Sequence, residues 1–124
     1  MRRPLLALAA LLALSAPAFA DELSDAKAAI VAAKLSTESD LYMWCGAAFT
    51  IASAATTDAA AKKTADDLMN VLFGKAAPLL TADGVADADL GKFGTYYAVV
   101  VKSQIVDQAE PPEHTQDECT AAAK

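Results

Sequence analysis

The sequence predicts an all-α protein, a four- or five-helix bundle that forms one small domain after an N-terminal signal peptide. Alanine, the strongest helix former, recurs throughout the chain. Runs of β-branched residues, which favour strands, are almost confined to Val99–Val101. Apolar residues instead repeat at spacings of three and four, as on one face of a helix. The domain is expected over residues 21–124, a length that suits one hydrophobic core.

Two helices are expected in the first third of this domain, over Glu22–Leu35 and Glu38–Ala55. Ser36 and Thr37 offer N-cap oxygens for the second helix, and Thr37 with Asp40 has the spacing of a capping box. Helical spacing predicts two inward stripes: Leu23, Ala26, Ile30 and Ala33 in the first helix, and Leu41, Cys45, Ala48 and Ala52, broadened by Trp44, Phe49 and Ile51, in the second.

A third helix is expected to begin at the Thr57–Asp58 cap and to end near Phe73. Gly74 and Pro78 predict its end, because proline lacks a backbone donor and glycine favours helix termini. The segment Gly74–Gly84 is then expected to be irregular. The inward face of the third helix is predicted to carry Ala61, Ala65, Leu68 and Leu72, and Leu79 and Leu80 are expected to fold back onto the core.

The fourth helix is expected over Ala86–Gln108. It must end before the sequence Glu110-Pro111-Pro112-Glu113, because proline lacks a backbone donor and restrains the residue before it. A short last helix is expected over Thr115–Ala123, capped by Thr115 and with acidic residues in its first turn. The inward face of the fourth helix is predicted to carry Leu90, Phe93, Tyr97, Val101 and Gln104.

Residues 1–20 have the three parts of a signal peptide. Arg2 and Arg3 form a positive start, Leu5–Leu14 is an apolar run, and Ala18-Phe19-Ala20 is a small-residue cleavage site. The apolar run is shorter than the roughly 20 residues that span a bilayer, so no stable membrane anchor is expected after cleavage. The sequence thus predicts a periplasmic or secreted protein.

Cleavage after Ala20 leaves 104 of the 124 residues, removes both arginines and changes the net charge from −6 to −8. An acidic protein repels nucleic-acid phosphates, so nucleic-acid binding is not expected. Without arginine, bidentate recognition of a phosphate or carboxylate is also excluded.

Cys45 and Cys119 are the two cysteines of the chain. In an oxidising compartment, two thiols that folding brings together form a disulfide, which is the predicted state of this pair. The alternative is a redox-active pair, but such cysteines usually lie close in sequence, as in Cys-x-x-Cys. The disulfide is expected to hold the last helix in place beyond the proline break.

Four residues are candidates for a groove or partner surface. Tyr42 and Tyr96 fall off the main stripe of their helices, where an aromatic ring can line a surface. Gly91 and Gly94 lie on successive turns of the fourth helix, where another backbone can approach closely; the alternative is a locally weakened helix.

No catalytic residue, metal ligand or cofactor is expected. The single imidazole, His114, lies beside prolines and is interpreted as a solvated loop residue, so a base for nucleophilic catalysis is lacking. Two acidic groups resemble cation sites but are interpreted as helix caps or solvated loop residues. They are Asp83, Asp87 and Asp89, which lack the spacing of an EF-hand, and Glu113 and His114 with Asp117.

The sequence Leu-Tyr-Met-Trp-Cys-Gly-Ala-Ala over residues 41–48, together with Glu118-Cys119-Thr120, resembles uncharacterised small exported helical proteins of bacteria that carry one disulfide. This resemblance implies no active site and no named functional family. In general plan the chain is also similar to the periplasmic acid-stress chaperones, which are small, helical, exported and stapled by one disulfide.

Two functional hypotheses follow. The first is a non-enzymatic periplasmic accessory or binding protein, stress-protective in one form, whose apolar groove between helices takes a protein partner or a small apolar ligand. The alternative is a secreted inhibitor or immunity-type protein whose acidic surface docks a basic envelope enzyme. The sequence does not predict the oligomeric state.

Overall fold

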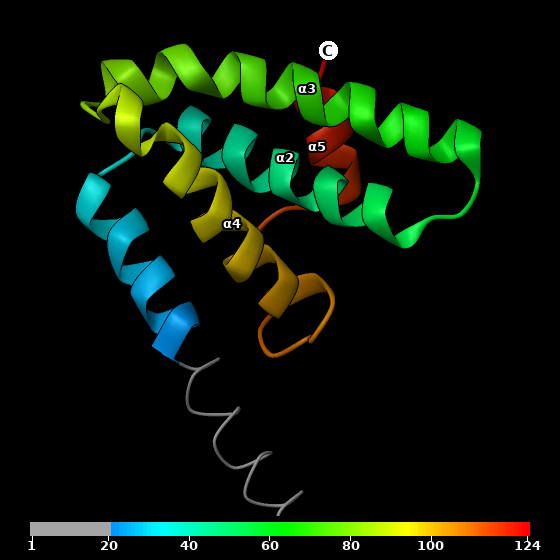
Figure 1. The fold of residues 1–124 in the computed structure, drawn as a ribbon, viewed down its shortest axis with the longest axis horizontal. Coiled ribbons are helices and arrows are strands. Elements are labelled where there is room, and N and C mark those ends of the chain that lie inside the picture. Colours follow the sequence, from blue (N-terminus) through cyan, green and yellow to red (C-terminus); the bar gives the residue numbers. More distant parts are fainter. Residues whose placement is uncertain (1–20) are drawn as a thin grey trace, which may run out of the picture.

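The computed structural model describes residues 21–124, and every regular element in that range is a helix, as predicted (Figure 1). The signal-peptide prediction lies outside the described residues. A first helix covers residues 21–33. It is followed by α2 (Thr37–Ala55), α3 (Ala59–Ala82), the 3-10 turn η1 (Asp87–Asp89), α4 (Leu90–Ile105) and α5 (Gln116–Ala122). Within residues 21–124, no helix combines the length and the apolar character that a membrane span needs.

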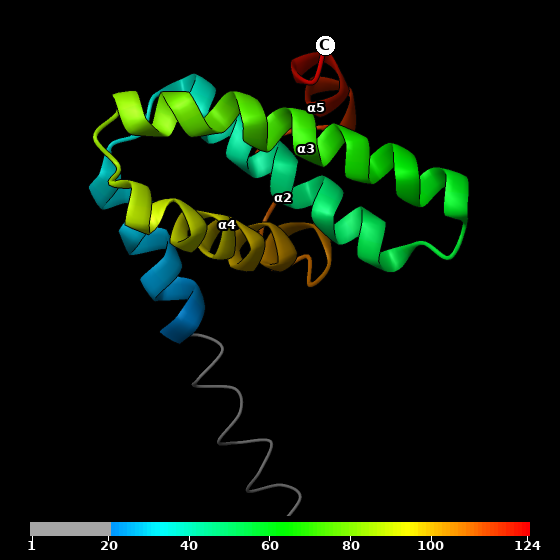
Figure 2. The ribbon, with the colours of Figure 1, turned by 45° about the horizontal axis from the view of Figure 1, so that its top comes forward.

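Helix α2 lies at the centre of the fold, and α3, α4 and α5 all pack on it. Figures 1 and 2 show α3 running alongside α2, while α4 crosses below it and α5 sits near its middle. Because partners surround α2, its buried surface is broader than the predicted stripe. The stripe is also displaced, since Met43 and Ala47 are buried whereas Ala52 is exposed.

The helix starts follow local capping chemistry. Ser36 caps α2 by accepting a hydrogen bond from the Ser39 N–H, so the predicted capping box at Thr37 is not the cap that the structure uses. Asp58 caps α3 and Thr115 caps α5, both as predicted. In all three helices, the cap side chain accepts a hydrogen bond from the backbone N–H three residues later.

Helix α3 is longer than expected, and the prediction that it ends near Phe73 is wrong. It continues through Gly74 and Pro78, although an interior proline costs about 3 kcal/mol. The compensation is a buried stripe with members one turn apart on the face toward α2: Leu72, Ala76 and Leu80. Burial of that stripe favours the continuous helix. The chain then leaves α3 at Gly84, whose φ of 98° suits glycine.

Helix α4 is shorter than expected at both ends. Its first predicted turn is the separate 3-10 turn η1, and α4 ends at Ile105 rather than Gln108. Gln108 has a φ of 53°, a left-handed conformation that cannot continue the helix. The predicted inward face of α4 is confirmed, with Leu90 half-buried and these residues buried: Phe93, Tyr97, Val101 and Gln104.

Candidate functional site

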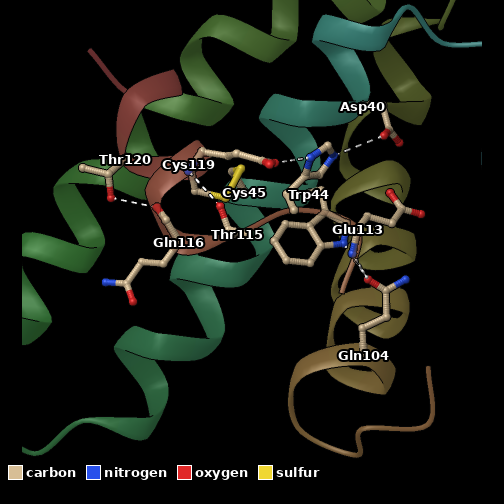
Figure 3. Close-up of a disulfide and its surroundings, with 11 residues drawn as sticks. Asp40, Trp44, Cys45, Gln104, Glu113, Thr115, Gln116, Cys119 and Thr120 are labelled. Carbon is tan, nitrogen blue, oxygen red and sulfur yellow. Dashed lines mark hydrogen bonds and ion pairs between the residues drawn. A yellow bond between two sulfur atoms is a disulfide. The ribbon is translucent and has the colours of Figure 1, made fainter. Parts of the chain in front are cut away.

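The predicted disulfide is present and joins Cys45 in α2 to Cys119 in α5, with 5.2 Å between the two Cα atoms (Figure 3). Both cysteines are buried in the core. Helix α5 has seven residues and Cys119 is its one buried side chain. The cross-link therefore holds an element that has little apolar surface of its own.

A second contact positions the loop that leads into α5. The Oε1 atom of Gln104 accepts a hydrogen bond from the Trp44 indole N–H at 2.8 Å and one from the Glu113 backbone N–H at 3.2 Å (Figure 3). Gln104 is 5% exposed, and its bond with Trp44 is shielded from water. The buried amide joins α2, α4 and the loop, and it holds the backbone of the loop in place at residue 113.

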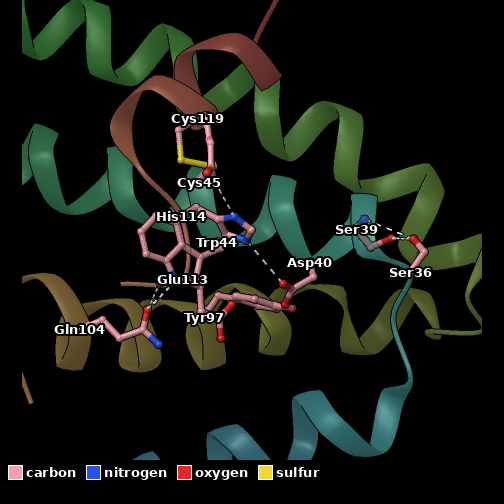
Figure 4. Close-up of polar contacts among 11 residues, drawn as sticks. Ser36, Ser39, Asp40, Trp44, Cys45, Tyr97, Gln104, Glu113, His114 and Cys119 are labelled. Carbon is pink, nitrogen blue, oxygen red and sulfur yellow. Dashed lines mark hydrogen bonds and ion pairs between the residues drawn. A yellow bond between two sulfur atoms is a disulfide. The ribbon is translucent and has the colours of Figure 1, made fainter. Parts of the chain in front are cut away.

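His114 is not the solvated loop residue that the sequence led us to expect. Its side chain is 19% exposed, and its ring meets the Trp44 ring edge-on at 5.3 Å between centroids. Nδ1 lies 3.0 Å from a carboxylate oxygen of Glu118, and Nε2 lies 3.7 Å from Oδ2 of Asp40 (Figure 4). The imidazole that follows the proline pair thus packs on Trp44 of α2 instead of lying in solvent.

Asp40 is the link between this histidine and α4. Its Oδ1 accepts a hydrogen bond from the Tyr97 hydroxyl at 2.6 Å. Burial, and then this bond to Asp40, raises the pKa of Tyr97 above its ordinary value, so the hydroxyl keeps its proton. Partial burial also raises the pKa of the Glu113 carboxyl, with the neighbouring charge of Asp40 as the next cause. Two carboxyl groups thus share a partly desolvated corner.

We call Asp40, Glu113 and His114 the His114 cluster. One donor atom from each lies within 4.8 Å of the other two, a spacing at which one ion can interact with all three. Asp117, which the sequence grouped with Glu113 and His114, is not part of this group. The other acidic set is also divided, since Asp83 bonds the Ser36 N–H and the Ser39 hydroxyl while Asp89 pairs with Lys92.

The second candidate site is apolar. We call it the α3/α4 groove, a hollow of about 310 Å³ that lies over α2. Two of the four predicted surface residues, Gly91 and Gly94, belong to it. Its lining comes from three helices: Met43 of α2, Phe73, Ala77 and Leu80 of α3, and Leu90, Gly91 and Gly94 of α4.

The two predicted tyrosines lie elsewhere. Tyr42 is half-buried, and the Lys75 ammonium lies 5.7 Å from its ring centroid. Tyr96 is half-buried against Phe93, with 5.5 Å between ring centroids. Neither tyrosine lines the α3/α4 groove, so the structure separates the tyrosine pair from the glycine pair.

Sequence reasoning missed Asp40 as a site residue, because it stands at a position where acids commonly support a helix start. Gln104 carried the one available signal. A glutamine within an apolar stripe needs a buried polar partner, and that partner had to come from another element.

Compared with known proteins, the chain matches no protein family, no curated protein and no solved structure.

Proposed function

We propose that the chain is a non-enzymatic binding protein, periplasmic or secreted, that holds a small apolar molecule in the α3/α4 groove. The observation that carries the proposal is the arrangement of two helices on a third. Helices α3 and α4 each pack extensively on α2 but make at most marginal contact with each other. Their facing sides form the walls of the groove, and Met43 of α2 is part of its lining.

The lining specifies the chemistry of the occupant. Every side chain that lines the groove is apolar, so a charged or strongly polar group gains no partner there. The volume of about 310 Å³ is at the lower end of the range for small-molecule sites, roughly 300–1,000 Å³. Both features favour a small aromatic molecule or a short acyl chain over a partner helix, which is about 10 Å across.

The two glycines keep the groove open. A Cβ atom built on Gly91 or Gly94 would have no heavy atom within 4 Å. Side chains at these positions would therefore occupy the groove rather than clash with its walls. Met43 adds an adaptable surface, since its unbranched thioether side chain fits ligands of different shape.

Two arguments support the remaining parts of the proposal. The groove lining holds neither a nucleophile nor a base, which favours binding over catalysis. The Cys45–Cys119 disulfide is compatible with an oxidising compartment, which favours export. The mass of the protein recovered from cells tests export directly: we expect a chain that begins at Asp21, and a mature protein that retains Met1 would contradict it.

Binding is tested with N-phenyl-1-naphthylamine, a neutral apolar dye that fluoresces in apolar surroundings. We expect the purified oxidised protein to bind it, and Gly94→Leu to weaken binding by at least about tenfold, equivalent to about 1.4 kcal/mol. Gly74→Leu is the matched control, because Gly74 is also a helical glycine with open space at its Cβ position but lies outside the groove.

The result is unambiguous in either direction. Dye binding that Gly94→Leu removes and Gly74→Leu preserves supports the groove as the binding site. An absence of dye binding, or equal binding by the two variants, contradicts the proposal. The alternative of an acidic inhibitor still depends on net charge alone, and capture of a basic envelope enzyme at low salt would favour it instead.

A further inference from the structure

The two ring nitrogens of His114 lie in different surroundings. Nδ1 faces the Glu118 carboxylate at 3.0 Å, so a hydrogen on Nδ1 leaves a lone pair on Nε2. Nε2 is shielded from solvent and has no hydrogen-bond partner among residues 21–124. A buried polar atom without a partner is costly and calls for an explanation. The closest acidic oxygen, on Asp40, lies 3.7 Å away, beyond hydrogen-bond distance.

We propose that the His114 cluster binds a divalent first-row transition metal ion, with Zn²⁺ as the best match. The donors are the Nε2 atom of His114 and one carboxylate oxygen each from Asp40 and Glu113. Imidazole nitrogen with carboxylate oxygen is a ligand set that zinc accepts, whereas Mg²⁺ and Ca²⁺ prefer oxygen ligands alone.

The spacing of the donors suits such an ion after a small movement. Ligand atoms about 2.0 Å from a tetrahedral zinc lie about 3.3 Å from one another. The Asp40 and His114 donors are 3.7 Å apart, and the three donor atoms lie within 4.8 Å of one another. The Glu113 side chain is exposed, so a change of rotamer brings its carboxylate closer without disturbing the core.

Hydrogen bonds with neighbouring side chains already orient two of the three donor residues, as in known metal sites. The Glu118 carboxylate accepts from Nδ1 of His114, which orients the ring and leaves Nε2 as the nitrogen available to an ion. The Tyr97 hydroxyl donates to the other oxygen of Asp40 and holds that carboxylate in place. Glu118 satisfies Nδ1 by a hydrogen bond, whereas Nε2 has only the longer ion-pair contact with Asp40 at 3.7 Å and no hydrogen bond among residues 21–124.

An ion can reach the cluster from the carboxylate side. The Asp40 side chain is 34% exposed and Glu113 is also exposed, while Trp44 covers one edge of the imidazole. Three protein ligands leave a fourth tetrahedral position for water or an exogenous ligand. This site uses none of the residues of the α3/α4 groove, so the two proposals fail or succeed separately.

The test is titration of the purified oxidised protein with Zn²⁺ by isothermal calorimetry, with Mg²⁺ and Ca²⁺ as comparison ions. We expect one Zn²⁺ per chain and no binding of the comparison ions at the same concentration. Asp40→Asn, Glu113→Gln and His114→Gln are each expected to weaken zinc binding by at least about tenfold, since removal of even a residue behind a ligand costs about 10–100-fold.

Asp117→Asn is the matched control. Asp117 lies on α5 three residues from His114, and removal of its carboxylate alters net charge as much as Asp40→Asn does. We expect its zinc affinity to match the wild type within about twofold, because Asp117 is outside the cluster. Asp40→Asn and Glu113→Gln keep side-chain shape on partly exposed positions, so both variants are expected to fold.

Glu118→Gln tests the positioning role of that residue. It is expected to reduce zinc affinity about 10–100-fold while Co²⁺, bound in place of zinc, keeps the same type of visible absorption spectrum. Trp44 is the chain's only tryptophan and touches His114, so quenching of its fluorescence by Co²⁺ reports binding at this site. The proposal is overturned if zinc does not bind, if Asp40→Asn leaves the affinity unchanged, or if Asp117→Asn weakens binding equally.

Discussion

The α3/α4 groove is lined by apolar side chains of three long helices, whereas the His114 cluster joins one side chain of α2 to two residues of a loop. The groove forms whenever α3 and α4 are packed on α2. The cluster forms only when the segment after Pro112 is folded back onto α2. Its construction depends on the Cys45–Cys119 disulfide, on Gln104 and on contacts of His114 itself.

The two candidate sites therefore have different sources of stability. The groove shares the main apolar core, so it should persist as long as the protein is folded. The cluster belongs to a segment with few buried apolar side chains, which should open at a lower free energy. Variants that separate the two sites test this view, and the largest effect is expected from the cross-link.

Replacing both cysteines, Cys45→Ala with Cys119→Ala, should lower the free energy of unfolding by about 4 kcal/mol, because the bond closes a loop with a sequence separation of 74. Urea denaturation measures the loss. Limited proteolysis should then cut first after residue 106, near the cluster, while α2 and α3 remain protected. Early cleavage within α2 or α3 would contradict the proposed difference between the two regions.

Replacing Gln104 with Leu should cost about 1–3 kcal/mol, because the buried Trp44 N–H loses its acceptor together with the Glu113 N–H. Thermal denaturation at neutral pH gives the change. In a Trp44→Phe background the same replacement should cost clearly less, since one of the two donors is already gone. Equal costs in both backgrounds would show that the Trp44 contact contributes little.

Gly46→Ala probes the wall of the groove. A Cβ atom at this position would lie 2.5 Å from Cε1 of Phe73, so the ring must move, and overpacking typically costs about 1–3 kcal/mol. The gain in helix propensity offsets about 1 kcal/mol of this. We expect a net loss of up to about 2 kcal/mol in chemical denaturation.

The control for Gly46→Ala is the Phe73→Leu background. A smaller side chain relieves the contact, so the same alanine should become stabilising there. Gly74→Ala should stabilise by about 0.5–1 kcal/mol in either background, because its Cβ position is open. If Gly46→Ala still destabilised the protein in the Phe73→Leu background, Phe73 would not be what limits the approach of α2 and α3.

The smallest effect is expected at Asp83, which belongs to neither site. A hydrogen bond from the Ser39 hydroxyl, and then one from the Ser36 N–H, lowers the pKa of Asp83 below its usual value. Stability from this carboxylate is therefore fully present above about pH 4 and is lost as the pH falls through the lowered folded-state pKa. Asp83→Asn should reduce the melting temperature near pH 7, with a difference that disappears toward pH 2.

Asp87→Asn is the control for Asp83, because the Asp87 carboxylate has neither a hydrogen bond nor an ion pair with residues 21–124. The melting temperature of Asp87→Asn should differ little from that of the wild type at every pH. If the Asp83→Asn difference instead increased on acidification, the bonds to Ser36 and Ser39 would not be the cause of the lowered pKa.

The sequence predicted those parts of the structure that depend on neighbouring residues or on composition. Asp58 and Thr115 mark helix starts because an N-cap acts over three residues. The disulfide followed from the expected compartment. Pro78 misled the prediction of α3, because the compensating burial of Ala76 and Leu80 depends on α2.

The candidate sites were predicted in part for the same reason. Gly91 and Gly94 were found because a pair of helical glycines one turn apart is visible in the chain itself. The meeting of Asp40 with His114 was not predicted, since those residues are far apart in sequence and come together only after the last segment docks. A local pattern cannot encode such a contact.

The cross-link also sets an order of events in the making of the protein. Cys45 lies in α2, and its partner Cys119 follows it at a sequence separation of 74. Because a polypeptide is synthesised from its N-terminus, the thiol of Cys45 emerges long before its partner exists. It must stay reduced and unreacted while α3 and α4 are made. The covalent closure of this protein therefore follows the synthesis of α3 and α4, and a chain truncated before Cys119 would keep Cys45 as a free thiol.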